Sequence, residues 1–585
     1  MSNKRIKYVG FILGVPLAAS LIFVACKRDF LNQETIGVLT EAEAQSAKGA
    51  RQFLTSTYAA LKGSGWEGGV SNWVYGSIVG GDANKGSDAG DQADIVPIQQ
   101  LTATPTNNYF NVKWRSLYEG IARANATIRV TSKLTDKDIS AAEKTQILAQ
   151  ARFLRGFYHF EAKKMWDNIP YVDETIEAAN AKVGNSKDWT RIMEDLDFAR
   201  KNLNAVQDQV GKVNKWAGEA YYAKALLFQG KYAEALPILT DVVNNGKTSR
   251  DLKYNLAPAF HDLFNADKDN DPTVRAESVF AYEASINDGS GGLNANYEHI
   301  LNFPYNGGPG GCCGFFQPTF ELVNSFRTSA TGLPLLDGSY NVGANQVKND
   351  QGLESSSTGY TPDGGNLDPR LDWTVGRRGI PYLDWGLHPG KSWIRDQGFG
   401  GPFAPKKNVY YKAQEGKLTD GTNWTSGLTA TNYKIMRFAD VLLMAAEAEV
   451  EAGSLEKARE YVNRVRTRAA VGRVKDAAGN DAANYVISNY TTAWTNKDVA
   501  RQAVRFERKL ELAMEGHRFF DLVRWGVADQ AINAFLTYEK TKLPTPYGAA
   551  TFTKGKHEYF PIPQRQIDLS STGGQSTLTQ NPGYQ

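Results

Sequence analysis

Hydrophobic residues recur every three or four positions in a series of long segments, which predicts a mainly α-helical protein. Ser140 and Glu143 have the spacing of a capping box, which is typical of a helix start. The pattern predicts helices over residues 41–61, 108–130, 140–165, 188–203, 215–229, 231–245, 438–452 and 455–469.

Two pairs of these segments share a skeleton of small residues. In each pair, a glycine lies five residues from an alanine on either side, and long segments with a helical period of apolar residues flank it. The two sets are Ala225, Gly230, Ala235 and Ala448, Gly453, Ala458. Two antiparallel helices with small residues at their crossing and glycine at the turn resemble the helix-turn-helix unit of tetratricopeptide repeats. The sequence therefore predicts a tetratricopeptide-like helical-repeat core, which could also serve as a protein-interaction scaffold.

Helical periodicity mostly vanishes between the two pairs, over residues 247–431. A structureless loop of this length is improbable in a compact protein. We therefore expect a large, irregular, loop-rich insertion that carries short helices and short strands of its own.

The segment 505–526 combines acids, histidine and arginines densely. Glu507, Glu511 and Glu515 recur every four residues, which places three carboxylates on one face of a helix, and His517 and Asp521 follow. Such groups could perform acid–base or metal chemistry. The apolar residues at 506, 510 and 513 and the interleaved arginines instead favour a helix that is packed on one side and ion-paired on the other.

The N-terminal residues have the pattern of a lipoprotein signal peptide over 1–25. Three basic residues precede an apolar run, which ends in small residues before Cys26, as in a bacterial lipobox. We expect Cys26 to be the lipid-attachment residue; a membrane span is the alternative. Removing residues 1–25 lowers the 66 basic residues to 63, which equals the 63 acidic residues, so the charge gives no reason to expect a nucleic-acid partner.

The remaining cysteines, Cys312 and Cys313, are neighbours in a glycine-rich loop. We expect two free thiols rather than a bridge, because a bridge between neighbours closes a strained ring. Asp82, Asp88, Asp91 and Asp94 lie in and beside another loop and are of the type that binds calcium, but their spacing lacks the EF-hand register and a closing Glu. We therefore predict no metal site and no cofactor.

Several blocks, taken in order along the chain, resemble one family, the RagB/SusD-like outer-membrane nutrient-uptake lipoproteins. Residues 507–526 resemble the family signature Glu-x-x-x-Glu-Leu-Ala-x-Glu-Gly-His-Arg-x-Phe-Asp-Leu-x-Arg-Trp-Gly. Further landmarks are residues 114–125, 151–158, 368–370, 436–449, 463–469, 560–568 and 578–584.

The resemblance implies a lipid-anchored protein of the outer membrane that faces the cell exterior. It implies binding of an oligosaccharide or other nutrient and delivery to a SusC-like TonB-dependent transporter. It also implies a division into a signal peptide (1–25), an N-terminal SusD-like helical region (26–246), an irregular ligand-binding part (247–431) and a C-terminal region with repeat and signature (432–585).

Carbohydrate binding suits flat aromatic rings beside planar amides and carboxylates. Aromatic residues in loops have both neighbours here, although each ring could instead close a loop over the core. The predicted ligand-binding residues are Trp66, Asn72, Trp73, Tyr75, Asp82, Asn84, Tyr305, Phe316 and Trp393.

An enzyme is the least favoured of the three hypotheses. No HExxH, GxSxG, P-loop or paired CxxC motif occurs, and the six histidines do not cluster in the sequence. We therefore expect no catalytic residues.

Overall fold

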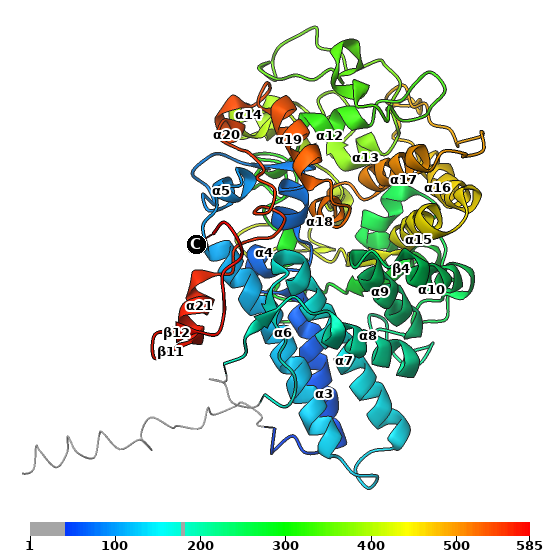
Figure 1. The fold of residues 1–585 in the computed structure, drawn as a ribbon. Helices are drawn as coiled ribbons and strands as arrows, with labels where there is room; N and C mark the ends of the chain where they lie inside the picture. Colours follow the sequence, from blue (N-terminus) through cyan, green and yellow to red (C-terminus); the bar gives the residue numbers. More distant parts are fainter. Residues whose placement is uncertain (1–40, 177–181, 585) are drawn as a thin grey trace, which may run out of the picture.

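A computed structural model describes residues 41–176 and 182–584 (Figure 1). The expected signal peptide and Cys26 lie outside these residues. Within the described ranges, no helix combines the length and apolar character that crossing a membrane requires.

The long helices confirm the predicted helical core. Ser140 caps one of them, with its hydroxyl oxygen accepting a hydrogen bond from the Glu143 amide at 3.2 Å. These helices are α3 (Ala47–Ala59), α6 (Asn108–Lys133), α7 (Ala141–Trp166), α8 (Thr190–Asn202), α9 (Lys215–Phe228), α10 (Tyr232–Asn245), α15 (Phe438–Ala452), α16 (Leu455–Ala469), α17 (Lys497–Glu511) and α19 (Ala528–Glu539).

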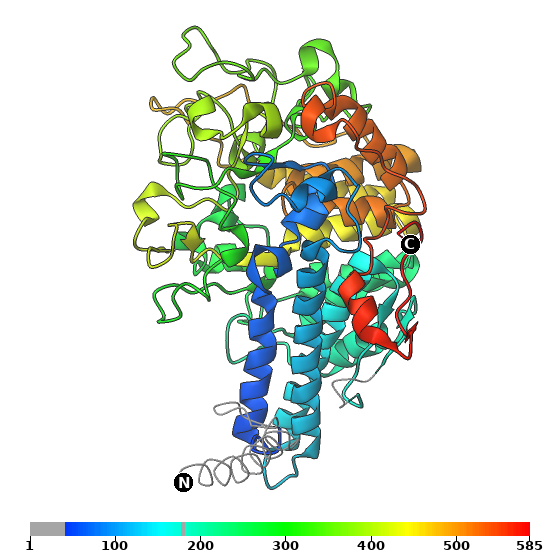
Figure 2. The same cartoon turned by 90° about the vertical axis from the view of Figure 1, so that its left-hand side faces the viewer.

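These helices stack side by side. In sequence order, α6, α7, α8, α9, α10, α15 and α16 each pack against the next, and α17 packs on both α15 and α16. Gly230, with a φ of 70°, makes the turn between α9 and α10, and Gly453 ends α15 before α16. The small-residue skeleton thus marks two helix pairs of a tetratricopeptide-like stack. Figure 2 shows α3 and α6 as long upright neighbours at one end of it.

The loop-rich insertion leaves the stack after α10 and returns at α15. Helices α10 and α15 touch each other although the whole insertion separates them in sequence. Strand β4 (Ser278–Tyr282) pairs antiparallel with β10 (Tyr433–Arg437) and joins the start of the insertion to its end. The insertion therefore does not interrupt the helical stack, because α10 and α15 still pack against each other.

The insertion and the flanking loops contain only short elements, as expected. The strands within the described residues form two-stranded antiparallel ladders, β1–β5, β2–β3, β4–β10, β6–β7, β8–β9 and β11–β12. The remaining strands are β1 (Ala83–Gly86), β2 (Ile169–Pro170), β3 (Asn185–Ser186), β5 (Phe315–Pro318), β6 (Val375–Gly376), β7 (Ala404–Pro405), β8 (Thr419–Asp420), β9 (Leu428–Thr429), β11 (Ser571–Thr572) and β12 (Gln575–Ser576).

The short helices are η1 (Ala60–Lys62), α4 (Gly65–Gly68), η2 (Trp73–Ile78), α5 (Ile95–Gln99), η3 (Phe260–Phe264), η4 (Ala266–Lys268), α11 (Pro272–Arg275), η5 (Tyr297–His299), α12 (Phe320–Ser325), η6 (Ser339–Asn341), η7 (Gly343–Asn345), α13 (Leu371–Thr374), η8 (Lys391–Trp393), α14 (Gln397–Gly400), η9 (Lys412–Gln414), α18 (Arg518–Arg524), α20 (Pro544–Tyr547) and α21 (Gln564–Ser570).

Candidate ligand-binding surface

The signature segment forms α17, a tight turn and α18. Gly516 turns the chain with a φ of 75°, and a Cβ there would lie 1.9 Å from the Ser71 carbonyl oxygen. Only glycine therefore fits. The side chains of Glu507, Glu511 and Glu515 are all buried.

The three signature carboxylates belong to one buried ionic cluster. Glu511 contacts Arg370 at 2.9 Å and Arg437 at 2.5 Å, and also pairs with Arg468. The cluster holds five carboxylates, Glu277, Asp368, Glu507, Glu511 and Glu515, and five cations, Arg370, Lys407, Arg437, Arg466 and Arg468. Charges of opposite sign thus balance in the interior, which a stable buried cluster requires.

This pairing fixes the charge state of the carboxylates. Burial raises the pKa of Glu511, but the guanidinium groups of Arg468 and Arg437 outweigh it and hold that pKa well below its ordinary value. The pKa of Glu515 is likewise lowered, to about 2, because Arg437 and Lys407 outweigh its burial. A carboxylate that stays ionised and saturated with partners is a structural group rather than a proton donor.

His517 also lacks the character of a catalytic base. Burial, with help from the Lys224 ammonium, lowers its pKa to about 4. Asp521, four residues on, pairs with Arg508 and Arg524. Across residues 41–176 and 182–584, no three His, Cys, Asp or Glu side chains gather as a metal site would need.

Trp73 and Tyr75 do not fit the predicted role in ligand contact. Each is 2% exposed, in the core. The Trp73 indole nitrogen donates to the Trp66 carbonyl at 3.2 Å, and the Tyr75 hydroxyl lies 2.9 Å from the Tyr109 carbonyl. Stacking on a sugar needs an exposed ring face, which neither residue has.

The three polar candidates nearby are also internal. Asn72 donates to Glu161 at 2.9 Å, and Asn84 donates to the Gly400 carbonyl at 3.1 Å. Asp82 accepts from the Met514 amide at 3.0 Å, just before the signature turn, and burial raises its pKa to about 6. These side chains are buried, and their hydrogen bonds hold the fold together, so ligand contact at these residues stays a prediction.

Phe316 and Trp393, which were also predicted to contact the ligand, are buried as well. Phe316 packs edge-on against Trp73, with ring centroids 5.5 Å apart. Trp393 packs edge-on against Tyr382 in a small hydrophobic cluster within the insertion.

The loop cysteines differ from the expectation too. Cys312 and Cys313 form a disulfide between neighbouring residues rather than two free thiols. Two of the considered calcium ligands, Asp88 and Asp91, both pair with Arg395 at 2.7 Å.

Trp66 and Tyr305 remain at the surface, partly buried, and a series of contacts links them. The Trp66 indole nitrogen donates to the Tyr109 hydroxyl at 3.2 Å, which donates to Gln92 at 2.8 Å. Asp91, which precedes Gln92 in the chain, pairs with Arg395. The guanidinium carbon of Arg395 lies 5.3 Å from the centre of the Tyr305 ring. We call this set, Trp66, Tyr109, Gln92, Asp91, Arg395 and Tyr305, the aromatic strip.

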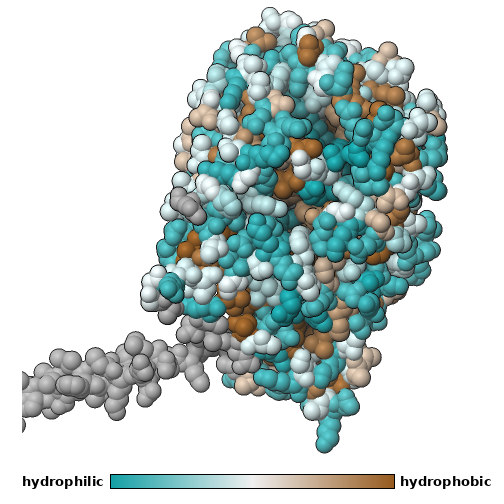
Figure 3. Space-filling model, in the orientation of Figure 1, coloured by the Kyte–Doolittle hydropathy of each residue, from teal (hydrophilic) through white to brown (hydrophobic). Residues whose placement is uncertain are grey.

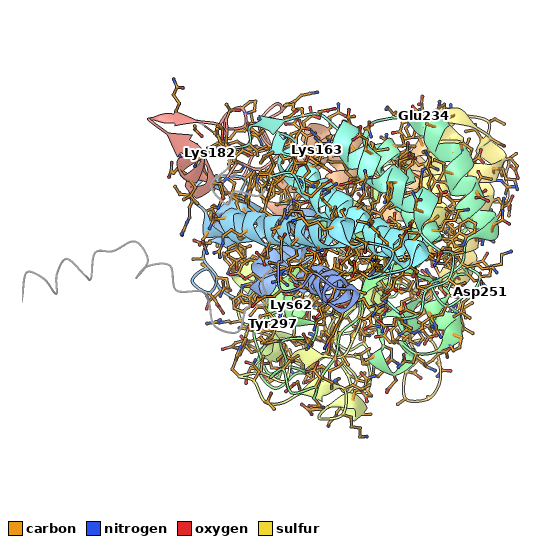
Figure 4. The ribbon with its side chains drawn as sticks, turned by 90° about the horizontal axis from the view of Figure 1, so that it is seen from below. Lys62, Lys163, Lys182, Glu234, Asp251 and Tyr297 are labelled. Atoms are coloured by element: carbon orange, nitrogen blue, oxygen red, sulfur yellow. A yellow bond between two sulfur atoms is a disulfide. The ribbon has the colours of Figure 1, made fainter. Side chains whose placement is uncertain are left out.

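One further aromatic residue, Tyr297, borders the aromatic strip. Tyr297 lies nearly parallel to Trp66, at 7° and 6.1 Å between ring centroids. Figure 4 shows Tyr297 near Lys62, which bonds the Leu293 carbonyl at 3.4 Å. Trp424 is 55% exposed, between the paired strands β8 and β9, and β9 packs against η5. The sequence contains no local signal that would distinguish these rings from buried ones.

The aromatic strip offers the groups that carbohydrate recognition uses. Ring faces can pack on the C–H face of a sugar, while a carboxylate, a guanidinium and an amide can bond its hydroxyls. The residues come from α4, the loop before α5, the first turn of α6, the segment after η5 and the segment after η8. The site is therefore assembled from both the N-terminal region and the insertion.

Comparison with known proteins identifies the family. A family model described as "SusD family" matches residues 276–584, more than half of the chain. The chain belongs to the SusD family. A second model, "Starch-binding associating with outer membrane", matches residues 73–227 of this SusD-family protein.

Relatives cover nearly the whole length of this SusD-family chain. SusD-like protein P25 of Formosa agariphila is 24% identical, over 95% of this chain and 96% of the relative. A SusD-like protein of Bacteroides ovatus is 24% identical, over 88% and 83%.

Solved structures confirm the fold. A SusD superfamily protein from Bacteroides vulgatus has a TM-score of 0.66 at 20% identity, over 92% of this chain and 98% of the other. A laminarin-binding SusD-like protein has a TM-score of 0.64 at 23% identity, over 92% and 100%. Surface glycan-binding protein A from Bacteroides thetaiotaomicron, in complex with laminarihexaose, has a TM-score of 0.63 at 20% identity, over 92% and 99%.

Proposed function

We propose that this protein binds an oligosaccharide at the cell surface and delivers it to a SusC-like TonB-dependent transporter. The observation that carries the proposal is the aromatic strip, where two partly exposed rings flank a carboxylate, an amide and a guanidinium. Family membership supports a glycan ligand, because relatives of the same fold are named for laminarin binding.

The ligand leaves the aromatic strip chemically unchanged in this proposal. Hydrolysis of a glycoside needs an acid and a base facing one cleft. In the aromatic strip, the Asp91 carboxylate pairs with Arg395, which suits a fixed hydrogen-bond acceptor. His159, His299 and His388 are buried elsewhere, and burial lowers the pKa of each to about 3, so these imidazoles are neutral at physiological pH.

Membrane attachment in this proposal depends on the N-terminal residues. The basic start, the apolar run and Cys26 support processing to a lipoprotein whose lipid lies in the outer membrane. A tethered body with a sugar site could then present its ligand to a transporter in the same membrane.

One experiment with the purified full-length protein in detergent tests the binding claim. Calorimetric titration with laminarihexaose, maltohexaose and xylohexaose should reveal binding of at least one, and chromatography of the mixture should return the sugar intact. Shortened sugars would indicate an enzyme. No binding across a broad glycan panel, together with co-purification of a protein partner, would favour the scaffold hypothesis.

A second arm tests attachment and delivery. Cys26→Ala should move the protein from the membrane fraction to the soluble fraction, and affinity purification of the wild type from membranes should recover a TonB-dependent transporter. Retention of the variant in membranes would contradict the lipid anchor.

A further inference from the structure

The signature segment, residues 507–526, borders a groove whose lining contains no residue of the aromatic strip. The groove has a volume of about 420 Å³ and lies between α17, α18, α19 and the segment before η6. Figure 3 shows the surface hollowed above its centre, in the region where Figure 1 places these helices. Its size falls within the range of small-ligand pockets, about 300–1,000 Å³.

Two arginines of the groove have acidic groups only at longer range: Glu447 for Arg505, and Asp82 and Glu321 for Arg518. Within residues 41–176 and 182–584, neither Arg505 nor Arg518 forms an ion pair or a side-chain hydrogen bond, and the Nε of Arg505 is buried without a partner. Arg508, on the same helix, pairs with both Asp440 and Asp521. On α17 and α18, the two arginines that form no ion pair both line the groove.

The other charges lining the groove are largely compensated. Arg501 pairs with Glu451 at 2.5 Å and also with Asp498. Lys509 pairs with Glu321 at 2.6 Å, and Glu321 also accepts a hydrogen bond from Tyr340. Asp498 is the groove's own acid and is already paired, so the excess charge is positive.

Aromatic rings form the walls of the groove. The guanidinium carbon of Arg505 lies 4.7 Å from the centre of the Trp525 ring. Tyr340 and Phe506 pack edge-on with their centroids 5.7 Å apart. A guanidinium held over an indole keeps its edge free for a planar anion.

We propose that this groove binds a small anionic sugar, whose carboxylate or sulfate contacts Arg505 and Arg518 and whose ring packs against the partly exposed Phe506. Guanidinium groups bind carboxylate and sulfate oxygens through paired N–H donors, and the aromatic walls suit an apolar ring face. The volume suits a mono- or disaccharide, whereas a protein partner would need about 800 Å² of surface on each side. The proposal uses no residue of the aromatic strip.

Calorimetry with digalacturonic acid, its neutral methyl ester and galactose 6-sulfate tests this proposal on the full-length protein. We expect the acid or the sulfate to bind, the ester to bind at least tenfold more weakly, and high salt to weaken anion binding. The two anions distinguish a carboxylate from a sulfate specificity. Binding of neither anion, or equal binding of acid and ester, overturns the proposal.

Arg505→Gln and Arg518→Gln should each weaken anion binding about tenfold, because each removes charged hydrogen bonds. Arg565→Gln is the matched control, since Arg565 is exposed and lies outside the groove. Thermal unfolding should be unchanged in all three variants. Unchanged anion affinity in both groove variants overturns the proposal, as does binding of an acidic peptide in place of both sugars. Binding of a neutral glucan at the aromatic strip should persist in them, so failure here leaves the proposed function standing.

Discussion

The ionic cluster around Glu511 and the aromatic strip both combine carboxylates with arginines, but they differ in their exposure to water. In the cluster, Glu511 and Arg370 are fully buried, and each is held by several partners of opposite charge. In the aromatic strip, Asp91 and Arg395 keep about 30% of their side chains exposed. Carboxylate–arginine pairs therefore stabilise the fold where they are buried, and they remain available to a ligand where they are exposed to water.

The largest effect is expected from neutralising the cluster. Glu511→Gln leaves Arg370, Arg437 and Arg468 without a shared counter-charge in the interior, so the free energy of unfolding should fall by about 3–5 kcal/mol. Denaturant titration followed by circular dichroism measures this.

The control for that variant is Glu456→Gln, which removes an exposed pair with Arg459 and should leave stability nearly unchanged. If both variants were equally stable, the contrast between buried and exposed ion pairs would fail for this protein.

A middle-sized effect is expected at a buried acid that forms no ion pair among the described residues. Glu539 is fully buried, and one of its oxygens has no hydrogen-bond partner among the described residues. Burial raises its pKa from 4.5 to about 8. Its contribution to stability is therefore fully present below pH 4.5 and is lost as the pH rises through 8.

Glu539→Gln should remove this pH dependence and make the protein more stable than the wild type at pH 8, by on the order of 1–3 kcal/mol. Unfolding midpoints of both proteins between roughly pH 4 and pH 9, a range that brackets the two pKa values, provide the measurement. Parallel curves would show that Glu539 is ionised in the folded state.

The smallest effect on stability, and the clearest on binding, is expected in the aromatic strip. Trp66→Ala removes a partly exposed ring and should weaken binding of the best glycan about tenfold, about 1.4 kcal/mol, with little change in unfolding. Trp494→Ala, another partly buried indole, should leave the affinity unchanged. Calorimetry gives both affinities, and equal losses in the two variants would exclude Trp66 from the site.

Trp66 and Trp73 show why the site was only partly predictable. Both lie in the same glycine-rich stretch, and the sequence assigns them the same role. The fold places Trp73 against Phe315 and Phe316 of the insertion, while Trp66 stays near the surface beside Tyr297. Burial of a loop residue depends on segments far away in sequence, so local pattern cannot decide it.

The cysteine pair and the signature carboxylates show a similar limit. The adjacency of Cys312 and Cys313 favours free thiols, because a bridge between neighbours closes a strained ring, whereas the structure has a disulfide there. The acids at 507, 511 and 515 were expected on one helical face with arginines interleaved, and most of their actual partners come from other landmarks, among them Arg370, Arg437 and Arg466.

The sequence by itself determined the helical stack, its small-residue crossings and the family, because each depends on a local period or on an ordered motif. Only the tertiary structure decided which rings are buried, which acids meet arginines, and which guanidinium groups remain unpaired. Those outcomes depend on contacts between segments that are far apart in the sequence. The free energy of burying a side chain depends on the neighbours that the fold places around it.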